Sequence, residues 1–254
     1  MRLSRRRSLF LLPALVATGA SAQPVGERSV SLKLVVLDIG GTLIGDHGEV
    51  PDAMLGAFSR KGITVTPQEF SGWRGASKRG MVRHFVEERG PSTGRAALEE
   101  AIYADFTSKV SKAYENVQPI PGAEKALQEL AAMKLLLCTT TGFDRALTTQ
   151  VFSHLGWQHY FVASITSDDV ADGRPAPYML FRAMEAAHVN ETADVLAVGD
   201  TPLDLQAAAN AGIAGVGVYS GAAPENRLRQ EKSISVLPSV ADLPALIRKD
   251  LPRR

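Results

Sequence analysis

The sequence contains little cysteine, no internal repeat and no long segment of low complexity. Its one cysteine, Cys138, excludes an internal disulfide, because a disulfide needs two thiols. Cys138 ends the apolar run at 135–138, and this context indicates a side chain buried in a strand rather than a catalytic nucleophile.

What remains is an ordinary globular composition, with 45% apolar and 22% charged residues. A chain of 254 residues is long enough to bury a sizeable core. The length fits either one large α/β domain or a core with a smaller inserted domain.

The first 22 residues differ from the rest of the chain. Residues 1–7 are cationic, residues 8–17 are mostly apolar, and small residues occupy 20–22 just before Gln23. This order predicts a secretory signal peptide over residues 1–22, and the arginine pair before the apolar segment resembles a twin-arginine signal. We therefore expect a periplasmic or secreted protein. The alternative is a mis-assigned start codon and a cytoplasmic protein.

The apolar segment of this signal is too short to cross a bilayer comfortably, so no stable membrane span is expected. The signal carries four arginines and no acidic residue, so its removal changes the formal net charge from +1 to −3. A mildly acidic chain gives no case for nucleic-acid binding.

The stretch 33–43, with the sequence KLVVLDIGGTL, organises the rest of the chain. Its continuous apolar run predicts a strand buried on both faces, and the run ends at Asp38. In parallel sheets, a carboxylate at the carboxyl end of a strand lies where ligands bind. Gly40 and Gly41 permit a sharp turn and a close approach of the backbone to a ligand. The alternative interpretation is a strand followed by an ordinary turn.

After this stretch, helical and strand patterns alternate, which predicts a doubly wound parallel α/β sheet. We expect four later strands, the last of which ends the core, at 134–138, 161–165, 195–198 and 215–218. Residues 48–115 show helical patterns only. We therefore predict a core of residues 31–47 and 116–254, with a small helical cap of residues 48–115 inserted after the first strand.

The expected strand ends bring four polar side chains to one edge of the sheet: Asp38, Thr140, Arg174 and Asp200. Asp38 can attack phosphorus and form an aspartyl-phosphate. Mg²⁺ bound by Asp38 and Asp200 would offset the repulsion between the carboxylate and the phosphoryl group. The Thr140 hydroxyl and loop amides can donate to phosphoryl oxygens, and Arg174 can neutralise developing charge. Together they predict phosphoryl-transfer chemistry.

Each of these residues also has a purely structural interpretation. Asp200 could cap the amino terminus of a helix, Thr140 could stabilise a turn, and Arg174 could be a surface charge. The common position of all four residues at strand ends favours the catalytic interpretation.

These residues fall in motifs that resemble the haloacid dehalogenase superfamily of aspartyl-phosphate hydrolases. The motifs are DIGGT at 38–42, Thr140, Arg174 and GDTPLD at 199–204. The resemblance covers nearly the whole chain after the signal and implies a helical cap after the first motif. It implies metal binding by Asp38, the Gly40 carbonyl and Asp200, with Asp204 supporting that site from behind. The phosphate- or substrate-binding residues that it implies are Gly41, Thr42, Thr141, Gly142 and Arg174.

Two departures from the common pattern resemble the phosphonatase-like branch of this superfamily. Gly40 stands where phosphatases carry an Asp that acts as acid and base, so acid catalysis from this position is excluded. Arg174 stands where a Lys is usual. The segments 168–179 and 140–143 are similar to those of phosphonoacetaldehyde hydrolases.

The branch uses a cap lysine that forms a Schiff base with the substrate aldehyde, and GASK at 75–78 matches its G-x-x-K motif. A protonated imine on Lys78 makes the carbon leaving group an enamine, so no acid is needed at position 40. We expect the neighbouring cations Arg74, Arg79 and Arg83 to lower the pKa of the amine. The alternative is a solvated surface lysine.

The leading hypothesis is a Mg²⁺-dependent hydrolase that cleaves the C–P bond of a phosphonoacetaldehyde-type substrate with Asp38 and Lys78. Met81 stands where phosphonatases have a His, which leaves the substrate open. The first alternative is a phosphomonoester phosphatase of the phosphoglycolate-phosphatase-like kind, in which Lys78 is a cation facing phosphate. The second is a catalytically impaired phosphate-binding domain.

The expected partner is therefore a small phosphonate or phosphate ester. A homodimer formed through Met54, Phe58 and Phe85 of the cap is a further hypothesis, and burial of these side chains in the core is the alternative.

Overall fold

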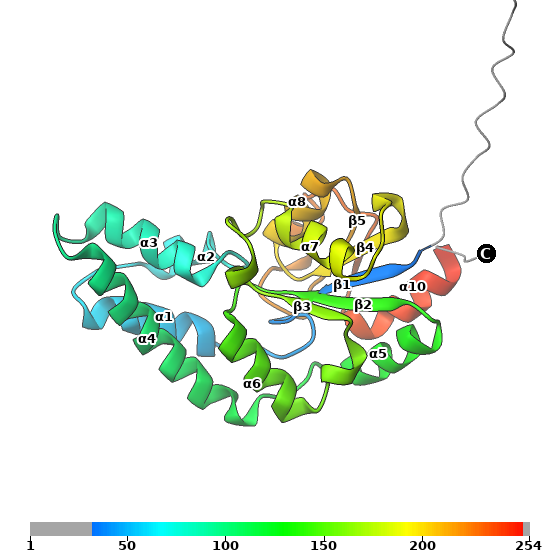
Figure 1. Ribbon diagram of the computed structural model, residues 1–254, viewed down its shortest axis with the longest axis horizontal. Coiled ribbons are helices and arrows are strands. Elements are labelled where there is room, and N and C mark those ends of the chain that lie inside the picture. Colours follow the sequence, from blue (N-terminus) through cyan, green and yellow to red (C-terminus); the bar gives the residue numbers. More distant parts are fainter. Residues whose placement is uncertain (1–31, 251–254) are drawn as a thin grey trace, which may run out of the picture.

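The computed structural model describes residues 32–250, so the predicted signal peptide lies outside the described residues. An all-parallel sheet of six strands forms the centre of the core, in the order β3-β2-β1-β4-β5-β6 (Figure 1). The strands are β1 (Leu34–Asp38), β2 (Leu136–Thr140), β3 (Ala163–Ile165), β4 (Val195–Gly199), β5 (Ala214–Val218) and β6 (Ser235–Leu237). This sheet confirms the predicted α/β fold class.

Apolar side chains cover both faces of β1, which explains its continuous apolar run. Leu34 and Val36 pack with α7 (Tyr178–Ala186) and α8 (Pro202–Ala211), whereas Val35 and Leu37 belong to the larger cluster on the opposite face. Figure 1 shows α5 (Ala123–Ala132), α6 (Arg145–Leu155) and α10 (Leu243–Asp250) on that opposite side. The strand order reverses between β1 and β4, and ligands bind in the crevice at such a switch point.

Two strand predictions need correction. The strand expected at 134–138 begins and ends two residues later, because Lys134 adopts a left-handed conformation with φ of 58° in the turn after α5. The strand at 215–218 is not the last of the core, because β6 pairs with β5 beyond the short helix α9 (Glu225–Leu228). The three residues of β6 are too few to show an alternating pattern.

Four helices lie between β1 and α5 and form the cap, to one side of the sheet in Figure 1. They are α1 (Glu49–Arg60), α2 (Pro67–Ser71), α3 (Lys78–Arg89) and α4 (Arg95–Ala113). Met54 and Phe58 are fully buried and Phe85 is 2% exposed, with the rings of Phe58 and Phe85 packed edge to face. These side chains fill the core of the cap, so the hypothesis that they contact a second copy is wrong.

The two segments that join the cap to the core are bonded to each other. Gly45 N donates to Gln118 O at 3.0 Å and Ile120 N donates to Leu43 O at 2.9 Å. The cap is therefore attached through a short double connection rather than through two independent linkers. Within residues 32–250, the helices are either too short or too polar to serve as bilayer-spanning segments.

We predict that Phe58→Ala lowers the free energy of unfolding by about 3–5 kcal/mol, because it leaves a cavity in a closely packed apolar cluster. The measurement is denaturant unfolding of the variant beside the unchanged protein. Phe181→Ala on α7 is the matched control, since Phe181 is 42% exposed, and it should cost less than about 1 kcal/mol. A small cost for Phe58→Ala would contradict the packing of the cap described above.

Candidate active site

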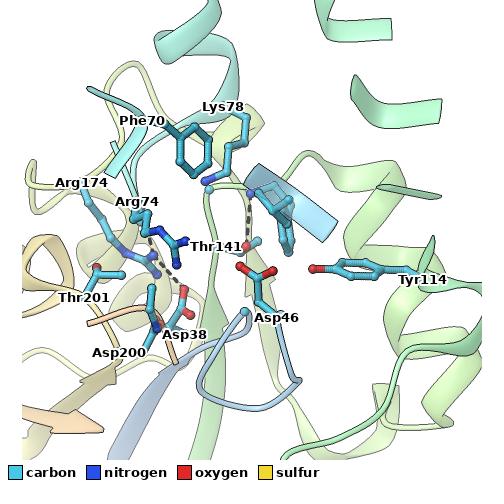
Figure 2. A pocket seen from close by; sticks show the side chains of 16 residues that line it. Asp38, Asp46, Phe70, Arg74, Lys78, Tyr114, Thr141, Arg174, Asp200 and Thr201 are labelled. Atoms are coloured by element: carbon cyan, nitrogen blue, oxygen red, sulfur yellow. Dashed lines mark hydrogen bonds and ion pairs between the residues drawn. The ribbon is translucent and has the colours of Figure 1, made fainter. Parts of the chain in front are cut away.

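A small cavity of about 50 Å³ opens at the carboxyl end of the sheet, between the core and the cap (Figure 2). Its walls come from the ends of β1, β2 and β4 and from α2 and α3. The lining residues are Asp38, Gly40, Asp46, Val50, Phe70, Arg74, Gly75, Lys78, Tyr114, Thr141, Gly142, Phe143, Arg174, Asp200, Thr201 and Ala222. Seven predicted site residues are among them: Asp38, Gly40, Lys78, Thr141, Gly142, Arg174 and Asp200.

Arg174 lies at the floor of this cavity and is 6% exposed, so the surface-charge interpretation is wrong. Its Nη1 donates to Asp38 Oδ1 at 2.8 Å, and its Nη2 donates to the carbonyl and the hydroxyl of Thr140 at 2.9 and 2.7 Å. Its Nε lies 2.9 Å from Asp204 Oδ1. Arg174 therefore joins the ends of β1 and β2 to α8 and fixes the direction of the Asp38 carboxylate.

Asp204 supports Arg174 and its own helix. Its Oδ2 accepts hydrogen bonds from Thr201 N at 3.0 Å and Thr201 Oγ1 at 2.5 Å, which completes the cap of α8. The amino-terminal cap of α8 is therefore Thr201, and the interpretation of Asp200 as that cap is wrong. Asp200 is free to line the cavity, where its Oδ2 accepts from Ala222 N at 2.5 Å.

The two threonines at the end of β2 have different surroundings. Thr140 uses its hydroxyl on Arg174 and lies behind the cavity wall. Thr141, one residue later, lines the cavity, and its Oγ1 accepts from Phe143 N at 3.2 Å. The hydroxyl at the cavity is therefore that of Thr141, whereas Thr140 positions Arg174.

The loop after Asp38 brings Gly41 against the metal-binding carboxylate predicted at Asp200. A Cβ atom on Gly41 would lie 2.2 Å from Asp200 Oδ2, and Gly41 has a φ of +81°, so only glycine fits here. Its amide donates to Ile44 O at 2.7 Å, inside the loop itself. Thr42 is fully buried, and its hydroxyl has no hydrogen-bond partner among the described residues. Both residues lie behind the cavity rather than in its wall.

Lys78 is the first residue of α3 and is 6% exposed, so the solvated-lysine interpretation is wrong. Its backbone N donates to Gly142 O at 3.3 Å, and its Nζ donates to Ala76 O at 3.1 Å. A Cβ on Gly142 would lie 2.3 Å from that same Ala76 oxygen, so glycine is needed for the cap to approach the core this closely. The cap thus places an amine in the cavity that also holds Asp38 (Figure 2).

Burial is the main reason that the pKa of Lys78 falls to about 8, and the Arg174 charge adds to the effect. Asp38, Asp46 and Asp200 act in the opposite direction. The predicted effect of Arg74, Arg79 and Arg83 on this pKa is wrong, because none of the three is among the charges that act on the amine. Arg79 pairs with Glu100 at 2.7 Å, and Arg83 lies 4.0 Å from Glu99.

The positive charge near Asp38 and Asp200 is too small to keep the pKa values of these two buried carboxylates in their usual range. Burial raises the pKa of Asp38 to about 7, against the opposing effect of Arg174. Burial, and then the charge of Asp38, raise the pKa of Asp200 well above its usual range. The donor set of two carboxylates and the Gly40 carbonyl contains only oxygen, which suits a hard divalent cation.

The described residues contain no group of three His, Cys, Asp or Glu side chains that could hold a metal by themselves. Mg²⁺ is ordinarily held by one or two carboxylates together with water and substrate oxygens. The residues present therefore fit Mg²⁺ better than a metal that needs a complete protein cage.

The cavity also contains residues that were not predicted as site residues, among them Asp46, Phe70, Arg74 and Tyr114. They come from the loop after the first motif, from two places in the cap and from the start of the return segment. Only the polar character of Asp46 near the first motif could have indicated its place, since the others reach the cavity through contacts between distant segments.

Comparison with known proteins shows the family to which the chain belongs. A family model for haloacid dehalogenase-like hydrolases matches residues 32–212. Phosphonoacetaldehyde hydrolase from Lysinibacillus sphaericus (strain C3-41) is 31% identical over 222 residues, which cover 82% of this chain and 81% of that protein.

Two solved structures share the fold. A phosphonoacetaldehyde hydrolase-like protein from Oleispira antarctica has a TM-score of 0.76 and 21% identity, covering 87% of this chain and 92% of that chain. β-Phosphoglucomutase from Clostridium difficile has a TM-score of 0.71 and 16% identity, covering 84% and 93%. The family model spans more than half of the sequence, and the chain belongs to the haloacid dehalogenase-like hydrolases.

Proposed function

We propose that this hydrolase cleaves the C–P bond of a small phosphonate that carries a carbonyl group β to phosphorus, as in phosphonoacetaldehyde. The observation that carries the proposal is the buried amine of Lys78 in the same cavity as the Asp38 carboxylate, with a pKa lowered to about 8. The name of the Lysinibacillus sphaericus relative supports the same substrate class.

Lys78 supplies the electron sink in this proposal. Its amine adds to the carbonyl carbon, water leaves, and a protonated imine forms. The electron pair of the C–P bond can then move into the imine and give an enamine. A leaving group of this kind needs no proton when the bond breaks, so the missing side chain at Gly40 is no obstacle.

Asp38 is the nucleophile that receives the phosphoryl group. Arg174 holds Oδ1 of its carboxylate at 2.8 Å, which orients the other oxygen for attack on phosphorus. The product is an aspartyl-phosphate, which water then hydrolyses. The buried guanidinium also remains beside the phosphoryl oxygens, where it can stabilise their negative charge.

Asp38, Asp200 and the Gly40 carbonyl would hold Mg²⁺ at this site. When bound, Mg²⁺ supplies positive charge that allows an anionic nucleophile to approach an anionic phosphonate. Thr141 and Gly142 also line the cavity, where the Thr141 hydroxyl can contact a phosphoryl oxygen.

The size of the cavity limits the substrate. Its volume of about 50 Å³ is room for roughly four water molecules. A phosphonyl group with a two-carbon aldehyde is of this order.

The second candidate is a phosphatase for a small phosphomonoester. It is favoured by Arg74, which also lines the cavity from the cap and forms no ion pair with the other described residues. In that case Lys78 and Arg74 would bind the substrate as charges, without a covalent step.

We predict that borohydride reduction in the presence of Mg²⁺ and phosphonoacetaldehyde attaches the substrate carbon skeleton to Lys78. Lys78→Arg should abolish the adduct and lower phosphate release by at least about 100-fold, because a guanidinium forms no imine. The measurements are mass-spectrometric mapping of the adduct and a phosphate assay. Lys61→Arg, at an exposed cap position, is the control and should retain both.

Two outcomes would reject the C–P mechanism. A wild-type chain without an adduct, or a Lys78→Arg variant with full phosphate release, would remove Lys78 from the chemistry. Release of phosphate from small phosphomonoesters by the same protein would then support the second candidate.

The rate of adduct formation should rise with pH, reach half of its maximum near pH 8 and level off above that pH. The neutral amine is the nucleophile, so a pKa lowered from 10.5 to about 8 leaves roughly one-tenth of Lys78 reactive at pH 7. The charges that face the amine are Asp38, Asp46, Asp200 and Arg174. Initial rates measured between about pH 6 and pH 10 test this, and a rate still rising at the upper end would contradict the lowered pKa.

A further inference from the structure

The hydroxyl of Tyr114 is a buried polar group without a partner. Tyr114 is 2% exposed, lines the cavity, and its Oη has no hydrogen-bond partner among the described residues. A buried hydroxyl left unpaired costs stability, so its retention needs an explanation. Figure 2 shows the hydroxyl pointing toward Asp46, on the side of the cavity away from Arg174.

The surroundings of Tyr114 keep it a hydrogen-bond donor. It begins the short 3-10 helix Tyr114–Asn116 directly after α4, and its ring packs edge to face on Phe143 with centroids 5.9 Å apart. Burial, followed by the negative charges of Asp46, Glu49 and Asp38, raises the pKa of its hydroxyl. The ring is held in place, and the proton stays on the oxygen.

Asp46 lies between this hydroxyl and the lysine. Its carboxylate lines the cavity, and its Oδ1 accepts from Gly48 N at 3.1 Å. It forms no ion pair with the rest of the described chain, yet its charge acts on both Tyr114 and Lys78. A substrate attached to Lys78 would therefore have a donor and a carboxylate on its far side.

Imine formation requires a side chain that takes up and returns protons. Neither residue 40 nor residue 81 provides one. Gly40 has no side chain, and Met81 is fully buried in the apolar core of the cap. Tyr114 and Asp46 supply a hydroxyl and a carboxylate in the same cavity as the Lys78 amine.

We propose that Tyr114 Oη and the Asp46 carboxylate form the subsite that receives the carbonyl oxygen of the substrate while Lys78 adds to its carbon. The inference rests on the proposed function and extends it to the carbonyl end of the substrate.

The proton balance of the step closes within the site. Asp46 takes one proton from the Lys78 ammonium, and the amine nitrogen forms its bond to the carbonyl carbon as the C=O π pair moves to oxygen. A second proton passes from that nitrogen to the oxygen, which gives a carbinolamine. Asp46 returns its proton to the same oxygen, the C–O bond breaks, and water leaves the protonated imine. Tyr114 donates a hydrogen bond to the oxygen throughout.

The first test is Tyr114→Phe in the full chain, with phosphonoacetaldehyde, Mg²⁺ and borohydride. The rate of adduct formation on Lys78 should fall about tenfold. The melting temperature should stay the same or rise, because the lost hydroxyl has no partner in the free protein. Tyr103→Phe is the matched control: its hydroxyl donates to Asp144 at 2.8 Å outside the cavity, so the melting temperature should fall and the adduct rate should not.

The second test is Asp46→Asn, which keeps an oxygen to accept from Gly48 N but cannot carry a proton. The adduct rate should fall about 100-fold, whereas Asp52→Asn at an exposed position of α1 should leave it unchanged. Unchanged adduct rates in both cavity variants, beside normal trapping in the wild type, would overturn this inference alone. No trapping in the wild type would overturn the proposed function and, with it, the subsite.

Discussion

The buried guanidinium of Arg174 is the interaction on which the rest of the site depends. Its five N–H groups meet acceptors on Asp38, Thr140, Asp204 and the carbonyl of Gly75, the last at 3.3 Å. One side chain thus joins β1, β2, α8 and the cap. Breaking a buried pair of this kind costs about 3–5 kcal/mol, since the remaining carboxylates lose their counter-charge. The position of the nucleophile is in this way tied to the stability of the core.

The core and the cap each supply part of the candidate site. The core supplies the Asp38 carboxylate, which Arg174 orients, and the Asp200 carboxylate. Burial raises the pKa of both groups. The cap adds the amine of Lys78, and the cavity between the two parts is small. Asp38 and Lys78 thus come from different parts of the fold and meet only where the cap touches the core.

The sequence was sufficient to predict the parallel sheet and five of its six strands, because buried parallel strands leave continuous apolar runs that end in polar residues. Asp38 and Asp200 were found in this way, whereas Arg174 lies in the loop between β3 and α7 and not at a strand end. The hydroxyl predicted to contact phosphate from Thr140 binds Arg174 instead, and the next residue, Thr141, lines the cavity. Neighbouring residues at a strand end point in different directions. Tyr114 carries no local signal, and Asp46 has only its polar character near the first motif. They meet because the segments on either side of the cap are bonded together, and such long-range contacts cannot be read from spacing.

The double connection between cap and core has a consequence for the order of events in a reaction cycle. Asp46 follows one of the two bonded segments and Tyr114 precedes the other, so both lie near the double connection between cap and core. Lifting the cap to admit substrate must separate Gly75 from Arg174 and Lys78 from Gly142. A lifted cap and an assembled site therefore exclude each other in this fold, because Lys78 lies in the same cavity as Asp38 only while the cap contacts the core.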